Sequence, residues 1–127
     1  MVVYGTDAEL PGGMDELSVT GPTQIIAFTS AHRHAYTIQP EEVGLRTARF
    51  EEIAALGNVQ RERDRLVDIL SGRGTQACTD MTCLNAAAVL FVGDLAASLE
   101  QGVTLARHAI EDGRAFAKLR QWQKAQA

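Results

Sequence analysis

The sequence predicts an α/β fold in which a short strand and a β-hairpin precede several packed helices. Runs rich in β-branched and aromatic residues lie at Met1–Tyr4, Thr23–Thr29 and Ala35–Ile38, and such runs are typical of strands. From Phe50 onward, apolar residues recur with helical spacing. The chain has 127 residues, of which 46% are hydrophobic and 22% charged. These values indicate one globular domain.

Composition also excludes several classes of protein. The net charge is −4 and no basic run stands out, which argues against a nucleic-acid or membrane partner. The longest apolar run, Leu84–Val92, is too short to span a bilayer. The start lacks the pattern of a secretory signal, so we expect a cytoplasmic protein. The two cysteines, Cys78 and Cys83, are too few for a disulfide framework, and we expect them to pack in the core rather than hold a metal.

The first strand, Met1–Tyr4, shows no polar alternation, so we expect both of its faces to be buried. The glycines in Gly5–Gly13 predict a loop after it. The two later β-rich runs predict a hairpin that ends before Pro40, because proline cannot donate to a ladder. The polar segment Ser30–His34 joins them.

Three histidines are weak candidates for metal ligands. His32 and His34 fall at the hairpin tip, without a third ligand nearby, and His108 falls inside a helix. We interpret all three as solvated residues.

The helical half contains clear start and stop signals. Asn58 is expected to cap a helix with a charged face that includes Glu62 and looks merely solvated. Thr79 or Asp80 is expected to cap a second helix, which is apolar nearly all round and therefore buried on most sides. The expected apolar face of the first helix is Val59, Leu66, Ile69 and Leu70.

The later helices follow the same logic. Ser98 and Gln101 form a capping-box pattern, and Gly113 is expected to end the helix that they open. The small side chains of Ala86–Ala88 should let another element approach closely. A last amphipathic helix carries Phe116, Leu119 and Trp122.

The segment Gly12–Thr23 contains the candidate metal-binding residues. Asp15 and Glu16 are adjacent acids between turn-forming residues, so both side chains can reach one ion. Mg²⁺ is typically held by one or two carboxylates, with waters and phosphates completing its shell. A bare Asp-Glu pair is more often simply solvated, and the residues alone leave both readings open.

Several motifs carry a resemblance to one family. The segment Gly13–Thr23, preceded by Val2–Gly5, resembles the acidic segment of anthranilate phosphoribosyltransferases. Further motifs follow in the family's order: Tyr36–Leu45, Leu84–Val92, Ser98–Val103 and Ile110–Ala115. The resemblance covers the whole chain but only the last third or so of that family's length.

The resemblance implies transfer of a phosphoribosyl group from phosphoribosyl pyrophosphate (PRPP) to anthranilate in tryptophan biosynthesis. It assigns Mg²⁺ to Asp15 and Glu16, with Asp15 acting directly or through water. A divalent ion there would stabilise charge on the departing pyrophosphate. We expect Ser18 and Thr20 to orient the loop through side-chain hydrogen bonds.

The chain also departs from the family. The N-terminal helical domain, the glycine-rich phosphate loop and the anthranilate-binding residues have no counterpart in 1–127, so the chain resembles the C-terminal part of a catalytic domain. Tyr4 replaces a frequent His, Glu62 replaces a frequent Asn, and Gly5–Gly13 is longer than usual. We therefore expect a fragment that is inactive alone and that binds a complementary N-terminal part or self-associates.

Two other classes stay open. One is a fragment of an enzyme related to pyrimidine-nucleoside phosphorylases, because fold does not fix substrate. The other is a non-catalytic interaction module.

Overall fold

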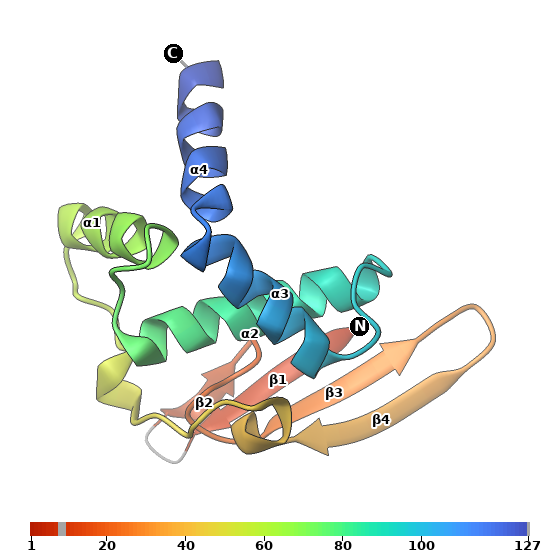
Figure 1. Ribbon diagram of the computed structural model, residues 1–127. Coiled ribbons are helices and arrows are strands. Elements are labelled where there is room, and N and C mark those ends of the chain that lie inside the picture. Colours follow the sequence, from red (N-terminus) through yellow and green to blue (C-terminus); the bar gives the residue numbers. More distant parts are fainter. Residues whose placement is uncertain (8–9, 127) are drawn as a thin grey trace.

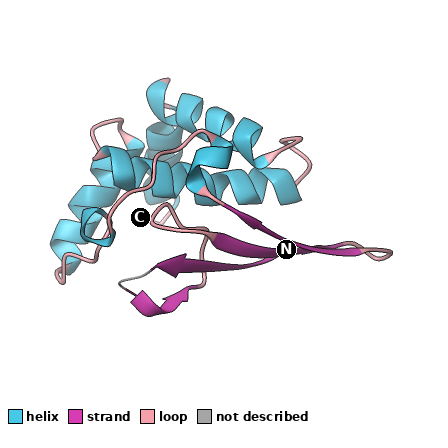
Figure 2. Ribbon diagram, turned by 90° about the horizontal axis from the view of Figure 1, so that it is seen from below, coloured by secondary structure: helices cyan, strands magenta, loops and turns pink. Residues whose placement is uncertain are grey.

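The computed structural model describes residues 1–7 and 10–126. A four-stranded antiparallel sheet forms one layer and the helices form the other (Figures 1 and 2). The strands are β1 (Val2–Asp7), β2 (Leu10–Met14), β3 (Thr23–Phe28) and β4 (Arg33–Ile38), in the spatial order β2-β1-β3-β4. The α-helices are α1 (Val59–Leu70), α2 (Gln76–Val92), α3 (Leu99–Glu111) and α4 (Arg114–Ala125), and two 3₁₀ turns occupy Pro40–Val43 and Phe50–Glu52.

The predicted hairpin is confirmed as β3 and β4, which pair in register from Thr23↔Ile38 to Phe28↔Arg33. The predicted loop over Gly5–Gly13 is wrong in the described residues. The first strand continues to Asp7 and pairs with β2 at Gly5↔Met14 and Asp7↔Leu10. Residues 8 and 9 lie outside the described part of the chain. The sequence of β2, Leu-Pro-Gly-Gly-Met, is poor in strand formers, so pairing with β1 overrides local propensity.

Among the described residues, the helices cover only one face of the sheet (Figure 2). On that face lie Val3 and its cross-strand neighbour Ile25, which is 1% exposed. On the other face Val2 is 57% exposed and Tyr4 is 43% exposed. The expectation that Met1–Tyr4 would be buried on both faces is therefore wrong for this chain, because its side chains alternate between a covered and an open face.

Most of the predicted helix signals are confirmed. The Asn58 side chain accepts a hydrogen bond from the Arg61 amide, and Ser98 does the same for Gln101. Gly113 follows α3 with a φ of 79°, which favours glycine. The expected cap at Thr79 or Asp80 is wrong, because α2 starts one turn earlier and its cap is Thr75.

The alanine face of α2 does allow close approach, as predicted. A Cβ at Gly102 of α3 would lie 2.7 Å from the Ala87 Cβ, so only glycine fits at this crossing. The tight α2–α3 pair forms the centre of the helical layer, and α4 extends away from it (Figure 1).

The outer helices are less buried than predicted. Of the expected α1 face only Ile69 is buried, whereas Val59 is 88% exposed and Leu66 is 47% exposed. In α4 no residue is buried and Trp122 is 60% exposed. None of the helices in the described residues has the length and apolarity needed to cross a membrane.

Candidate functional site

Asp15 and Glu16 directly follow β2, and both side chains are exposed. In the described part of the chain, neither carboxylate has a hydrogen-bond or ion-pair partner. The acids therefore keep all their lone pairs available for a ligand from outside the chain. They are consecutive residues at the end of β2, and that both side chains reach one ion stays a prediction.

The backbone just after the acids is fixed by Asn85 of α2. The Leu17 amide donates to Asn85 Oδ1 at 3.0 Å, and Asn85 Nδ2 donates to the Leu17 carbonyl at 2.9 Å. Asn85 Nδ2 also donates to the Met81 carbonyl of its own helix at 3.0 Å. One amide side chain thus holds both backbone groups of Leu17, and Leu17 itself is 1% exposed.

The next turn of the loop is closed by three hydroxyls. The buried Ser18 amide donates to Thr23 Oγ1 at 2.9 Å. The Thr20 amide donates to Ser18 Oγ at 2.9 Å, and the two hydroxyls of Ser18 and Thr20 are themselves 2.9 Å apart. These contacts agree with the expectation that Ser18 and Thr20 orient the loop.

Two glycines let the loop lie against β1. A Cβ at Gly5 would be 2.7 Å from the Glu16 carbonyl oxygen, so the loop passes directly over this residue. Gly13 has a φ of 64° and its missing Cβ would collide with the Tyr4 ring. Tyr4 therefore packs against Gly13, two residues before Asp15, and its hydroxyl donates to the Gly12 carbonyl at 3.3 Å.

A groove of about 510 Å³ lies beside the acids, between β1 and α2. Glu16 is the one charged side chain in its lining. The other walls include Val3 of β1 and the residues Asn85, Val89 and Val92 of α2. Glu16 therefore borders an apolar groove, and Asn85, which holds the Leu17 backbone, lies in its wall.

The donor set fits a magnesium ion that takes only one or two ligands from the protein. Two exposed carboxylates on a fixed backbone match the one or two carboxylates that Mg²⁺ usually takes from protein. No cluster of three or more His, Cys, Asp or Glu residues suited to a metal occurs in the described residues. This chain would therefore supply part of a coordination shell and leave the rest to waters and phosphates.

The other sequence candidates lie apart from this site. His32, His34 and His108 are exposed, and the His34 ring stacks on Tyr36 with 5.3 Å between centroids. Cys78 and Cys83 are buried and free, which agrees with the packing role expected for them. Burial raises the pKa of the Cys83 thiol, so this group stays protonated at neutral pH.

Two acids have structural partners that the sequence did not reveal. The face containing Glu62 was expected to be merely solvated, but Glu62 Oε1 accepts from the Leu56 amide at 2.6 Å. This bond first, and then the nearby Arg65 guanidinium, hold the Glu62 pKa below its usual range. Asp80, only 2% exposed, accepts from Gln76 at 2.7 Å and from Arg107 of α3 at 2.5 Å, so it links α2 to α3.

The fold and the acidic loop can now be compared with known proteins. The model of the glycosyl transferase family, a/b domain, matches residues 4–116. The chain therefore belongs to this family, and the α/β class predicted from the sequence is confirmed. Its curated relatives include anthranilate phosphoribosyltransferases, in agreement with the resemblance drawn from the motifs.

The enzyme of Neisseria meningitidis serogroup C is 37% identical over 107 residues, which cover 84% of this chain and 30% of that protein. The Bacillus licheniformis enzyme is 39% identical over 108 residues, which cover 84% of this chain and 31% of that protein. The chain thus spans about a third of the length of these relatives.

Solved structures agree. Anthranilate phosphoribosyltransferase from Thermus thermophilus has a TM-score of 0.78 at 29% identity, and the match covers 87% of this chain and 32% of that one. The Saccharomyces cerevisiae enzyme in complex with PRPP and Mg has a TM-score of 0.71 at 21% identity, over 93% of this chain and 31% of that one. The second likeness supports the fold alone.

Proposed function

We propose that this chain is the part of an anthranilate phosphoribosyltransferase that presents the magnesium-binding acids to PRPP. The observation that carries the proposal is the acidic loop: two unpartnered carboxylates on a backbone clamped by Asn85, in a chain whose relatives bear this enzyme's name. In the reaction, a C–N bond forms between the ribose and the anthranilate amine, and the C–O bond to pyrophosphate breaks.

Asp15 and Glu16 would hold the ion, Asp15 directly or through water. When bound, Mg²⁺ neutralises negative charge on the phosphates. The chain's own contribution is to keep two carboxylates at a fixed place without reorganisation at the moment of reaction. Asn85, Ser18 and Thr23 supply that fixation through their bonds to the loop backbone.

We also propose that the other two-thirds of the enzyme's length supply the phosphate loop and the anthranilate site. On this view the isolated chain has no transferase activity. The test compares the isolated chain with a chimera in which it replaces the matched region of the N. meningitidis relative. Consumption of anthranilate with saturating PRPP and Mg²⁺ is followed by fluorescence.

The expected result is turnover by the chimera and none by the isolated chain. Turnover by the isolated chain that Asp15→Asn abolishes would refute the fragment proposal. An inactive but folded chimera would refute the catalytic one.

A second candidate, a non-catalytic interaction module, is favoured by one observation. Three large apolar side chains at the end of α2 and just beyond it are more than half exposed: Val89, Val92 and Leu95. Such a surface indicates a partner, which an interaction module requires.

A further inference from the structure

The segment between β4 and α1, residues 39–53, is bonded to the acidic loop (residues 15–22), and we call this segment the strap (gold to yellow in Figure 1). The Ala48 amide of the strap donates to the Val19 carbonyl of the loop at 2.8 Å. Val19 is 0% exposed and Ala48 is 5% exposed, and both belong to the hydrophobic core. The bond therefore joins two buried backbones.

The strap bond and Asn85 act on neighbouring points of the acidic loop. Asn85 holds both backbone groups of Leu17, and the strap holds the carbonyl of Val19, two residues further on. The Leu17 and Val19 side chains are both buried in the core. Asp15 and Glu16 directly precede this anchored stretch, so loosening either anchor would loosen the backbone that carries the acids.

One carboxylate of the strap holds the residue before Ala48. Glu41 Oε1 accepts from the Thr47 amide at 3.1 Å and from the Thr47 hydroxyl at 2.5 Å. The hydrogen bond from the hydroxyl lowers the pKa of Glu41, so this group is a carboxylate at neutral pH. Because Thr47 precedes Ala48, the two bonds restrain the peptide group that presents the Ala48 amide to the loop.

Glu41 itself extends from a well-anchored turn. The Leu45 amide donates to the Pro40 carbonyl at 3.0 Å and closes the 3₁₀ turn Pro40–Val43. Pro40, Val43 and Leu45 are buried. From this turn the Glu41 side chain reaches six positions along the chain to Thr47.

The other two glutamates that accept from backbone amides of the strap act differently. Glu42 accepts from the Gln39 amide at 2.6 Å, and Glu52 accepts from the Arg49 amide at 2.9 Å. Each of these bonds caps the 3₁₀ turn to which its glutamate belongs. The bonds of Glu41 instead leave its own turn and end beside the contact with the acidic loop.

We propose that Glu41 is a positioning residue for the magnesium-binding acids: it holds Thr47 so that the Ala48 amide keeps the Val19 carbonyl, and with it the acidic loop, in place. Glu41 acts through the backbone and touches neither the ion nor the substrate. The inference rests on the proposed function, in which an ordered acidic loop binds Mg²⁺–PRPP. It gives a role to the glutamate of the motif Tyr36–Leu45.

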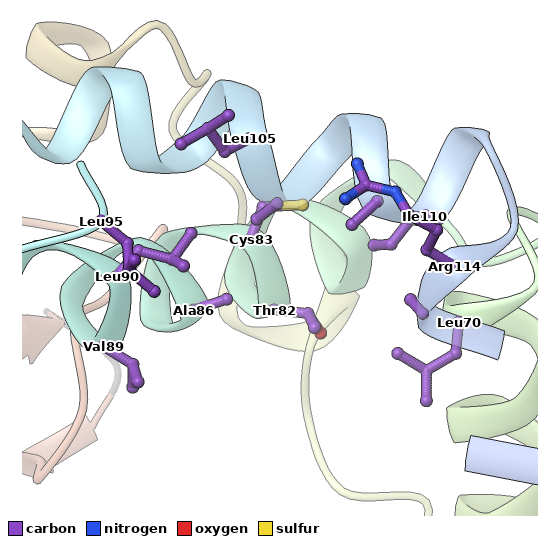
Figure 3. Close-up of a pocket in the computed structure, with 13 residues that line it drawn as sticks. Leu70, Thr82, Cys83, Ala86, Val89, Leu90, Leu95, Leu105, Ile110 and Arg114 are labelled. Carbon is purple, nitrogen blue, oxygen red and sulfur yellow. The ribbon is translucent and has the colours of Figure 1, made fainter. Parts of the chain in front are cut away.

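The test compares Glu41→Ala, which removes both bonds to Thr47, with Glu41→Gln, which keeps an acceptor oxygen of the same shape. The matched control is Glu62→Ala, because Glu62 also accepts from a backbone amide, that of Leu56, but lies on α1. A second control, Ile110→Ala, lowers stability elsewhere. Ile110 lines a groove of about 560 Å³ along α2 and α3, which no described residue of the strap or the acidic loop lines (Figure 3).

Hydrogen exchange of the Ala48 amide in the 127-residue chain reports the strap bond directly. Glu41→Ala should speed this exchange by about tenfold relative to the unsubstituted chain, because charge-assisted hydrogen bonds that restrain the amide are lost. Glu41→Gln should restore slow exchange, and Glu62→Ala should leave it unchanged. Equal exchange of the Ala48 amide in Glu41→Ala and the unsubstituted chain would overturn the inference.

Steady-state kinetics of the chimera with the N. meningitidis relative measure the consequence for the acids. Glu41→Ala should raise the KM for Mg²⁺–PRPP by about fivefold, because displaced binding groups lose productive geometry, and should leave the KM for anthranilate unchanged. Glu41→Gln should restore the KM for Mg²⁺–PRPP. Ile110→Ala and Glu62→Ala should move neither KM, which separates positioning from a general loss of stability.

Two failures are distinguishable in the same assay. An active chimera whose KM for Mg²⁺–PRPP is unaffected by Glu41→Ala, or rises equally with Ile110→Ala, would overturn the positioning role alone. An unsubstituted chimera that is folded and inactive would overturn the proposed function, and this inference with it.

Discussion

Two polar connections of the sheet, the acidic loop Asp15–Pro22 and the hairpin tip Thr29–His32, both expose ionisable side chains but differ in how they are held. The acidic loop is bonded to other elements, to the distant helix α2 through Asn85 and to the start of the following strand β3 through Thr23. Within the described part of the chain, the tip is bonded only to itself: the Ala31 and His32 amides donate to Thr29 Oγ1 at 3.3 and 3.2 Å, and the Thr29 amide donates to the His32 carbonyl.

This difference separates a binding loop from a solvated turn better than composition does. Side chains on a self-contained turn move with it, so a ligand must order them at an entropic cost. Carboxylates on a loop whose backbone is bonded to a buried helix start from an ordered backbone, so a ligand must order only their side chains. Asp15 and Glu16 fall in the second class, and His32 falls in the first.

The contrast between the acidic loop and the hairpin tip predicts that the largest effect of a substitution is on catalytic activity. In the chimera, Glu16→Gln preserves shape but removes the charge, so activity should fall by roughly a hundredfold, the size of effect seen when one electrostatic stabiliser is lost. The loss should appear in the dependence on Mg²⁺ and PRPP and not in the KM for anthranilate. His32→Gln at the tip is the control and should change neither. Unchanged magnesium dependence in Glu16→Gln would reduce the pair to solvated loop acids.

The next effect concerns the clamp. Asn85→Ala removes both bonds to Leu17, which should lower stability by about 1–3 kcal/mol and raise the KM of the chimera for Mg²⁺–PRPP by about tenfold. Asn58→Ala removes a helix cap and should cost about 1 kcal/mol without moving that KM. Thermal unfolding gives the stability and steady-state kinetics give the KM. If both variants change KM in proportion to stability, Asn85 has no specific positioning role.

Sequence patterns predicted the features that depend on interactions between residues close together in the chain. The β3–β4 hairpin followed from two β-rich runs around a polar segment, and the helix caps followed from Asn58, Ser98 and Gly113. These signals lie within a few residues of the feature that they determine. The turn-forming residues around Asp15 and Glu16 marked this pair as a candidate site. The resemblance to anthranilate phosphoribosyltransferases implied that the pair binds Mg²⁺.

The features that the sequence did not predict depend on contacts between residues far apart in the chain. Asn85 lies 68 positions from Leu17, and nothing in the helical pattern around it marks a clamp. The strand β2 contains Pro and Gly residues that argue against a strand, and its pairing with β1 stabilises it. The glycine at position 5 was a usable signal, since glycine within a strand often marks close approach of another backbone.

The smallest expected effect is on the free energy of unfolding, and a matched pair of threonine variants measures it. Thr23 is 1% exposed and its hydroxyl accepts from the buried Ser18 amide, whereas Thr29 is exposed and its hydroxyl serves the tip alone. Thr23→Val keeps the shape but leaves a buried N–H unpaired, so it should lower the free energy of unfolding by about 1–3 kcal/mol. Thr29→Val frees two exposed amides to bond with water, so its cost should stay within about 0.5 kcal/mol. Urea unfolding of the two variants measures both, and equal costs would mean that the acidic loop is held no more firmly than the tip.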